Sequence, residues 1–271
     1  MITKNNWCTS NILEKLNDPL VEFDAYIKPY AFSDMSFDEA CEFTCNEIYK
    51  HHKNLYLALS GGMDSEFILR TFHKYNIPIQ PIIVLCGNEI ESKYAFNACD
   101  ELGVTPIVFT KSEDELFSFF RTHIYDKLGG IGYNCTQMLF TAEYVIQQHG
   151  VLITGNHFMG DGYEFSADEC YASINEWDFY TDAIFKESHN IDFLLYTPEI
   201  VYASMPKHNV TWCEYKAKLF NVEFRDKIKH SYSDSTREKI MDLLNSLPKR
   251  VPYRKNWSRQ DFFNAFESVK R

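Results

Sequence analysis

"LALSGGMDSEF" (residues 57–67) is the stretch that decides the fold, because it joins a short apolar run to a glycine turn and then to a helical pattern. The apolar run predicts a buried strand, and the spacing of apolar residues from Asp64 onward predicts a helix. Gly61 and Gly62 can adopt backbone dihedral angles that are closed to other residues, and they let a ligand approach the backbone. The stretch therefore predicts a strand, a loop with a binding role and a helix.

The same alternation continues along the chain. Four short apolar runs predict strands: 54–59, 79–86, 105–110 and 151–155. Helical patterns lie between these runs, and Ser36 and Glu39 have the spacing of a capping box, so a helix is expected before the first strand. Repeated strand and helix alternation predicts an α/β fold with a parallel sheet and helices on both faces.

Three regions are expected along the 271 residues. An N-terminal extension covers 1–35, the α/β domain covers 36–165, and a mainly helical region covers 166–271. The last boundary is placed where the strand and helix alternation stops and aromatic, mainly helical segments follow. The last region is expected to form a lid or part of a substrate site.

Charge and composition exclude some classes of protein. The formal net charge of −11, from 38 acidic and 27 basic residues, makes nucleic acid an improbable partner. No window approaches a membrane span, and the N-terminus lacks the apolar run of a signal peptide, so a cytoplasmic protein is expected. The eight cysteines contain no CxxC pair and are expected to be thiols, with Cys86 packing rather than reacting.

The glycine loop has the composition of a phosphate site. Ligands of open α/β sheets lie beyond the carboxyl ends of the strands, where this loop is expected. Backbone N–H groups, the hydroxyls of Ser60 and Ser65 and a helix N-terminus all offer donors to an anion. Asp64 would repel a phosphate unless a cation lies between them, so Mg²⁺ is expected there. The loop is not a Walker A motif, because GxxxxGK[ST] is absent from the chain.

"SGGMDS" (60–65) resembles the SGGxDS signature of the PP-loop ATP pyrophosphatases. This superfamily includes asparagine synthetase, GMP synthetase, NAD synthetase, the 7-cyano-7-deazaguanine synthases and several tRNA-modifying enzymes. The resemblance covers about 36–165 and includes a helix with Glu91 and the segment "TGNHFMGDG" (154–162). It implies a Rossmann-like sheet that binds ATP.

The resemblance also implies roles for individual residues. The pyrophosphate part of ATP would be held by Ser60, Gly61, Gly62 and Ser65. Asp64 would bind Mg²⁺, with Asp161 as a second metal contact, although an Asp after a strand is also a common turn residue. Gly155 would lie close to the ribose, and Leu85 would lie against the adenine.

Members of this superfamily cleave ATP between the α and β phosphates and form an adenylate, which a nitrogen or sulfur nucleophile then displaces. The resemblance therefore implies an amide-forming ligase that acts on an unidentified small acyl substrate and uses ammonia or an amine. A catalytic cation is also needed. The first candidates are Lys249, Arg250, Arg254 and Lys255, and the rivals are Lys216 and Lys218, although such a residue is more often a solvated surface charge.

Two alternative functions stay open. The chain could transfer sulfur, for which Cys135 and Cys170 would have to be brought together by the fold. It could be an ATP-binding module without catalytic activity. It could also assemble as a homo-oligomer. A built-in glutaminase is not expected, since the chain begins Met1-Ile2-Thr3 and the segment before the first strand is short.

Overall fold

The structure is a computed structural model. It describes residues 1–18, 20–86, 89–125, 136–155, 171–175, 185, 190–204, 212–222 and 254–258, together with the single residues 235, 238, 239, 242, 245, 264 and 268. Within these ranges no helix is both long enough and apolar enough to cross a membrane.

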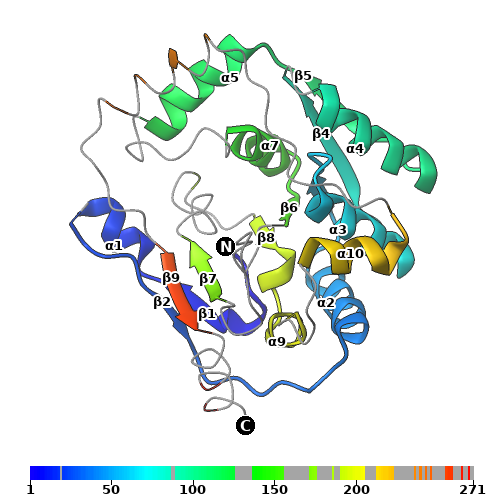
Figure 1. Ribbon diagram of the computed structural model, residues 1–271. Coiled ribbons are helices and arrows are strands. Elements are labelled where there is room, and N and C mark those ends of the chain that lie inside the picture. The colour runs from blue at the N-terminus through cyan, green and yellow to red at the C-terminus, as the bar shows by residue number, and fades with distance from the viewer. Residues whose placement is uncertain are drawn as a thin grey trace.

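A parallel sheet of five strands forms the centre of the molecule (Figure 1), which confirms the predicted fold class. In spatial order the strands are β5 (Ile107–Thr110), β4 (Gln80–Leu85), β3 (Leu55–Ala58), β6 (Val151–Thr154) and β8 (Asn190–Asp192). From β3 the chain moves outward to β4 and β5, and then returns to the other side of β3 with β6. The sheet therefore has its topological switch point between β3 and β6, which is where ligands of such sheets bind.

Helices cover both faces of the sheet. One face packs against α2 (Phe37–His51), α3 (Met63–Lys74) and α4 (Glu89–Leu102), and the other packs against α7 (Thr136–Gln147). Alternate strand residues serve the two faces: Leu57 belongs to the larger apolar core and Tyr56 lies against the smaller one. Between β5 and α7 the chain forms α5 (Glu113–Phe119) and the π-helix η2 (Phe120–Tyr125).

The capping box that the sequence predicts is present at the start of α2. The Glu39 N–H donates to the Ser36 Oγ at 3.3 Å, and the Ser36 N–H donates to Glu39 Oε2 at 2.9 Å. These two bonds satisfy groups that the first turn of a helix leaves without intrahelical partners. Hydrogen bonds from Ser36 hold the pKa of Glu39 below its usual value.

The C-terminal region contributes strands as well as helices. Its β8 is the fifth strand of the main sheet, and β7 (Tyr171–Asn175) pairs with β9 (Arg254–Ser258) in a separate antiparallel sheet. The helices described there are α9 (Pro198–Ala203) and α10 (Trp212–Phe220), and a short 3-10 helix, η5 (Phe193–Leu195), links β8 to α9. The main sheet thus extends past residue 165, where the sequence places the end of the α/β domain.

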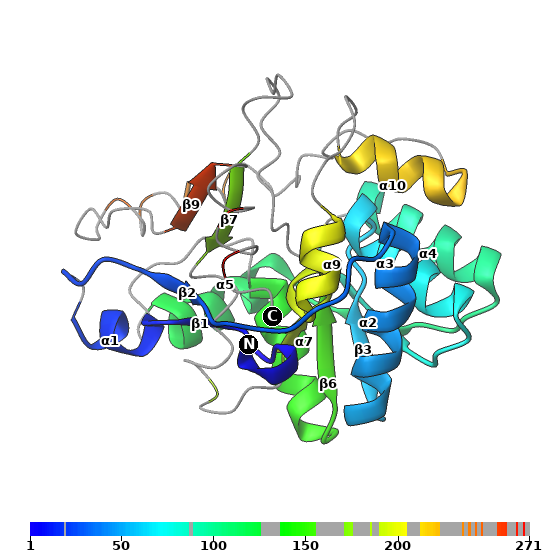
Figure 2. The same ribbon diagram turned by 90° about the horizontal axis from the view of Figure 1, so that it is seen from below.

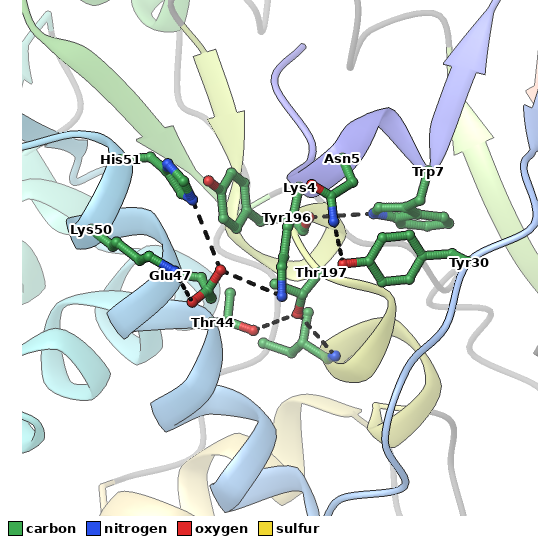
Figure 3. A network of polar contacts seen from close by, with 11 residues as sticks. Lys4, Asn5, Trp7, Tyr30, Thr44, Glu47, Lys50, His51, Tyr196 and Thr197 are labelled. Carbon is green, nitrogen blue, oxygen red and sulfur yellow. Dashed lines mark hydrogen bonds and ion pairs between the residues drawn. The ribbon is translucent and has the colours of Figure 1, made fainter. Parts of the chain in front are cut away.

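The N-terminal extension is folded onto the rest of the protein. It contains η1 (Lys4–Asn6), the antiparallel pair β1 (Cys8–Ser10) and β2 (Ala25–Ile27), and α1 (Ile12–Asn17). Figure 3 shows Trp7 directed toward the segment after β8 and the Lys4 side chain directed toward Glu47 of α2, together with the contact between Thr44 and Thr197. The Trp7 indole N–H contacts the carbonyls of Leu195 at 3.2 Å and Tyr196 at 3.3 Å.

Candidate active site

The SGGMDS loop lies at the switch point of the sheet. It follows β3, and α3 begins inside it at Met63, with Gly62 as the N-cap residue and no side-chain cap. The first N–H groups of a helix have no intrahelical partners and carry partial positive charge. The loop and the first turn of α3 therefore form the kind of end that binds phosphate.

The two serines of the loop bond to the loop itself. The Ser60 N–H donates to the Ser65 Oγ at 3.3 Å, and the Ser65 hydroxyl donates to the Gly62 carbonyl at 3.1 Å. The Gly62 N–H donates to the Ser60 Oγ at 3.2 Å. Both hydroxyls thus fix the shape of the turn, a role that the expectation of direct phosphate contacts did not include.

Two glycines of the loop have different environments. Gly61 has a φ of +92°, and a Cβ atom there would lie 1.9 Å from the Glu91 carbonyl oxygen at the start of α4. A Cβ at Gly62 would have one neighbour within 4 Å, the Ser60 Oγ at 3.3 Å. Gly61 is therefore required by packing against α4, whereas an added Cβ at Gly62 would meet only the Ser60 hydroxyl.

Gly155 lies beside Asp64. It follows β6, and a Cβ at this position would lie 2.7 Å from the Ile68 Cδ1 and 3.3 Å from the Asp64 Cβ. The absence of a side chain lets the end of β6 approach the first turn of α3. The structure thus brings together two of the positions that the sequence selects, although they are far apart along the chain.

Lys216 of α10 forms an ion pair with the Asp64 carboxylate. The Lys216 side chain is fully buried, and that of Asp64 is 25% exposed. Burial lowers the pKa of Lys216 well below its usual value. Figure 2 shows α10 beside α3, and the rings of Phe220 and Phe67 meet with their centroids 5.7 Å apart. Lys216 is thus the cation that the described structure places at the loop, and Lys218 on the same helix is exposed.

The remaining positions selected from the sequence are dispersed. Leu85 ends β4, and its carbonyl accepts a hydrogen bond from the Lys111 N–H at 2.8 Å. Arg254 begins β9 opposite Asn175, and both views place this strand near β1 and β2, apart from α3 and α10 (Figures 1 and 2). Lys249 and Asp161 lie outside the described residues, so their roles stay predictions.

The oxygen atoms near Asp64 are suited to Mg²⁺. Magnesium is usually bound by one or two carboxylates together with waters and phosphate oxygens of the substrate. Asp64 supplies one carboxylate beside the open backbone of Gly62, and across the described ranges there is no cluster of three metal-binding side chains. These residues fit a metal shared with a phosphate rather than one enclosed by protein.

No protein-family model matches the sequence, and no curated protein matches it. Among solved structures, three similar chains are the NMN synthetase from Francisella tularensis, a predicted subunit of tRNA methyltransferase from Methanocaldococcus jannaschii, and the NH3-dependent NAD synthetase from Campylobacter jejuni. In this order the identities are 15%, 16% and 15%, and the TM-scores are 0.37, 0.41 and 0.37. The matches cover 78%, 73% and 80% of this chain and 94%, 98% and 100% of the other chains.

Proposed function

We propose that this protein is an ATP pyrophosphatase that adenylates a carboxyl or carbonyl oxygen of a small molecule and then forms an amide with ammonia or an amine. The observation that carries the proposal is the SGGMDS loop at the switch point of the sheet, where Asp64 lies against Gly155 and pairs with Lys216. A phosphate site at this place needs backbone donors, room for the ligand and a balance of charge. The loop provides the backbone donors, and Lys216 of α10 balances the charge of Asp64.

In the proposed reaction the substrate oxygen attacks the α-phosphorus of ATP, and the bond to the β-phosphate oxygen breaks to release pyrophosphate. The N-terminus of α3 would bind the phosphates, with Mg²⁺ at Asp64 supplying further charge neutralisation when it is bound. Lys216 would stabilise the negative charge that builds on the phosphates. Ammonia or an amine then attacks the acyl carbon, AMP leaves with the electron pair of the C–O bond, and the nitrogen releases a proton to water to give the neutral amide.

The cysteines favour a nitrogen nucleophile over sulfur transfer. Five of the six cysteines in the described ranges are buried free thiols: Cys8, Cys41, Cys45, Cys86 and Cys99. Burial raises the pKa of Cys86 to about 11, and a protonated thiol is a poor nucleophile. Cys135 and Cys170, the pair that sulfur transfer would need, lie outside the described residues. Free thiols also support a reducing compartment such as the cytoplasm for this reaction.

The test is exchange of labelled pyrophosphate into ATP, measured with Mg²⁺ and a pool of candidate carboxylates, followed by separation of the nucleotides formed with ammonia present. We expect exchange that depends on one carboxylate, and formation of AMP and pyrophosphate. Asp64→Asn should reduce both at least about 100-fold, because a preorganised charge at the phosphates is lost. Formation of ADP and phosphate would contradict the proposal.

A further inference from the structure

We propose that Lys216 is an exchangeable counter-ion: it neutralises Asp64 while the site holds no nucleotide and transfers to the phosphates when a metal–nucleotide complex binds. The inference rests on the proposed function, because it takes Asp64 as the metal-binding carboxylate. It adds a coupling between metal binding and nucleotide binding that neither the loop nor the fold implies.

The ion pair places two cations in competition for one carboxylate. The Lys216 ammonium lies against the Asp64 carboxylate with no exposed surface on its side chain. A divalent ion on the same carboxylate competes with this ammonium, and an ammonium that is driven from Asp64 would be buried without a counter-ion. Such an uncompensated buried charge is strongly unfavourable. Asp64 should therefore bind a metal weakly as long as Lys216 has no other anion.

A nucleotide removes this competition. Asp64 lies in the first turn of α3, and the phosphates would enter at the N-terminus of the same helix. They would offer the Lys216 ammonium a new negative partner. Metal and lysine could then both be neutralised at the same time. Thermodynamic linkage makes this effect reciprocal, so the metal also strengthens nucleotide binding. The lysine thus favours entry of the metal–nucleotide complex over entry of the metal alone.

The position of α10 allows such a transfer. At its C-terminal end the helix meets a cavity of about 240 Å³ between α3 and α4, which Asn221 and Val222 help to line. Polar side chains of the other two helices, among them Glu66, Arg70 and Asn97, form much of the rest of its wall. The cavity gives the end of α10 space in which to move, and a small shift of the helix would carry the Lys216 ammonium from Asp64 to a phosphate.

The test measures binding of Mn²⁺ by electron paramagnetic resonance, first alone and then with an ATP analogue whose α and β phosphates are joined by a methylene group. Wild type, Lys216→Met, Asp64→Asn and the matched exposed control Lys218→Met are compared. Without nucleotide, Lys216→Met should bind Mn²⁺ at least about 10-fold more tightly than wild type, because the competing cation is gone. With the analogue present, Lys216→Met should bind the Mn²⁺–analogue complex at least about 10-fold more weakly than wild type, because the phosphates have lost their lysine partner. Lys218→Met should match wild type in both states.

Unchanged Mn²⁺ binding by a folded Lys216→Met variant, in the absence of nucleotide, would overturn the inference while leaving the proposed function intact. Failure of wild type to bind Mn²⁺ with the analogue, or full binding by Asp64→Asn, would instead count against the metal role in the proposed function. If Lys216→Met does not fold, hydrogen exchange of 212–220 in wild type decides: Mn²⁺ at high concentration should speed exchange, and Mn²⁺ with the analogue should slow it. Equal exchange in all three states would overturn the inference.

Discussion

Glycines of the SGGMDS loop illustrate how one sequence signal can have two physical causes. The sequence predicts that both Gly61 and Gly62 serve the ligand. In the structure, Gly61 combines a φ of +92° with close approach to the backbone of α4, whereas a Cβ at Gly62 would meet only the Ser60 hydroxyl. A motif therefore identifies the residues of a loop, but it does not separate those that bind a ligand from those that let the loop pack.

Gly61→Ala should lower the free energy of unfolding by at least about 2 kcal/mol, because the new methyl group would overlap the Glu91 carbonyl and φ would be strained. Gly103→Ala is the matched control. Gly103 has a φ of +66° and no atom within 4 Å of an added Cβ, so it should lose only about 1 kcal/mol from strain. Urea unfolding measures both changes, and equal losses would show that the contact with α4 has no energetic weight.

Loss of Asp64 and loss of Lys216 from the ion pair should lower the free energy of unfolding by different amounts. Asp64→Asn leaves the Lys216 ammonium buried without a counter-ion and should cost about 3 kcal/mol of unfolding free energy. Lys216→Met should cost less, because a quarter of the Asp64 side chain remains exposed to water. The double variant should be close to Lys216→Met. A double-mutant cycle by urea unfolding checks this, and additive losses would mean that the two groups do not interact.

At the scale of elements, α9 contains a carboxyl group in an unfavourable place. Glu199 lies in its first turn and is only 5% exposed, and within the described residues its Oε2 has no hydrogen-bond partner. Burial raises the pKa of Glu199, although hydrogen bonds from the backbone of Glu199 and Ser33 and the positive charge of Lys4 oppose the effect. The ionised form of this side chain therefore reduces the stability of the fold at neutral pH.

Glu199→Gln should stabilise the protein at pH 7 by on the order of 1 kcal/mol, since an amide of the same shape has no charge to desolvate. The folded pKa lies above the usual 4.5, so the wild-type fold is favoured at low pH and loses stability as pH rises between the two values. The advantage of the variant should disappear below about pH 4. Urea unfolding across this range is the measurement, with exposed Glu14→Gln as the control. A gain that persists at low pH would indicate a cause other than ionisation.

The elements that the sequence predicts are those with a strong local signal. The four expected strands and the capping box at Ser36 are present because apolar runs and capping residues act within a few positions. The strand β8 has three residues, Asn190–Asp192, which is too short for any periodicity to show. The pairing of β7 with β9 also escaped prediction, because it joins segments that are distant in sequence.

The same limit applies to the site. The loop at 60–65 could be identified because its residues are adjacent, but the choice of cation could not. Lys249, Arg254, Lys216 and Lys218 are equivalent in sequence, since nothing local distinguishes a lysine that will be buried. The structure places Lys216 at Asp64 because Phe220 of α10 packs against Phe67 of α3.

At the scale of the whole molecule, the N-terminal extension holds distant segments together. The Lys4 side chain lies 3.4 Å from Glu47 of α2, while its backbone N–H donates to the Tyr196 carbonyl at 2.6 Å. Trp7 is 1% exposed and packs in the main apolar core. These contacts join the start of the chain to the segment that leads from β8 into α9.

Trp7→Ala should therefore lose about 3–5 kcal/mol of unfolding free energy, because a fully buried ring is removed. Trp7→Phe retains an aromatic ring but loses the indole N–H that contacts the Leu195 and Tyr196 carbonyls, and it should lose about 1–3 kcal/mol. Leu20→Ala, at a side chain that is 90% exposed, is the control and should change little. If both Trp7 variants were as stable as the control, the N-terminal extension would not stabilise the fold.

The docking of the first residues has a consequence for synthesis on the ribosome. The Ile2 N–H donates to the carbonyl of Asn190, and the Trp7 indole contacts the carbonyls of Leu195 and Tyr196. These partners are translated long after Ile2 and Trp7 have emerged. At typical rates of elongation this delay is roughly 10–40 s. During that time β3, β4, β5 and β6 can pair, and β1 can pair with β2, but the Trp7 indole N–H lacks the Leu195 and Tyr196 carbonyls that it contacts in the folded protein. A nascent chain would therefore expose this apolar tryptophan until Leu195 and Tyr196 have emerged from the ribosome, which makes the segment around Trp7 a natural place for a chaperone to bind.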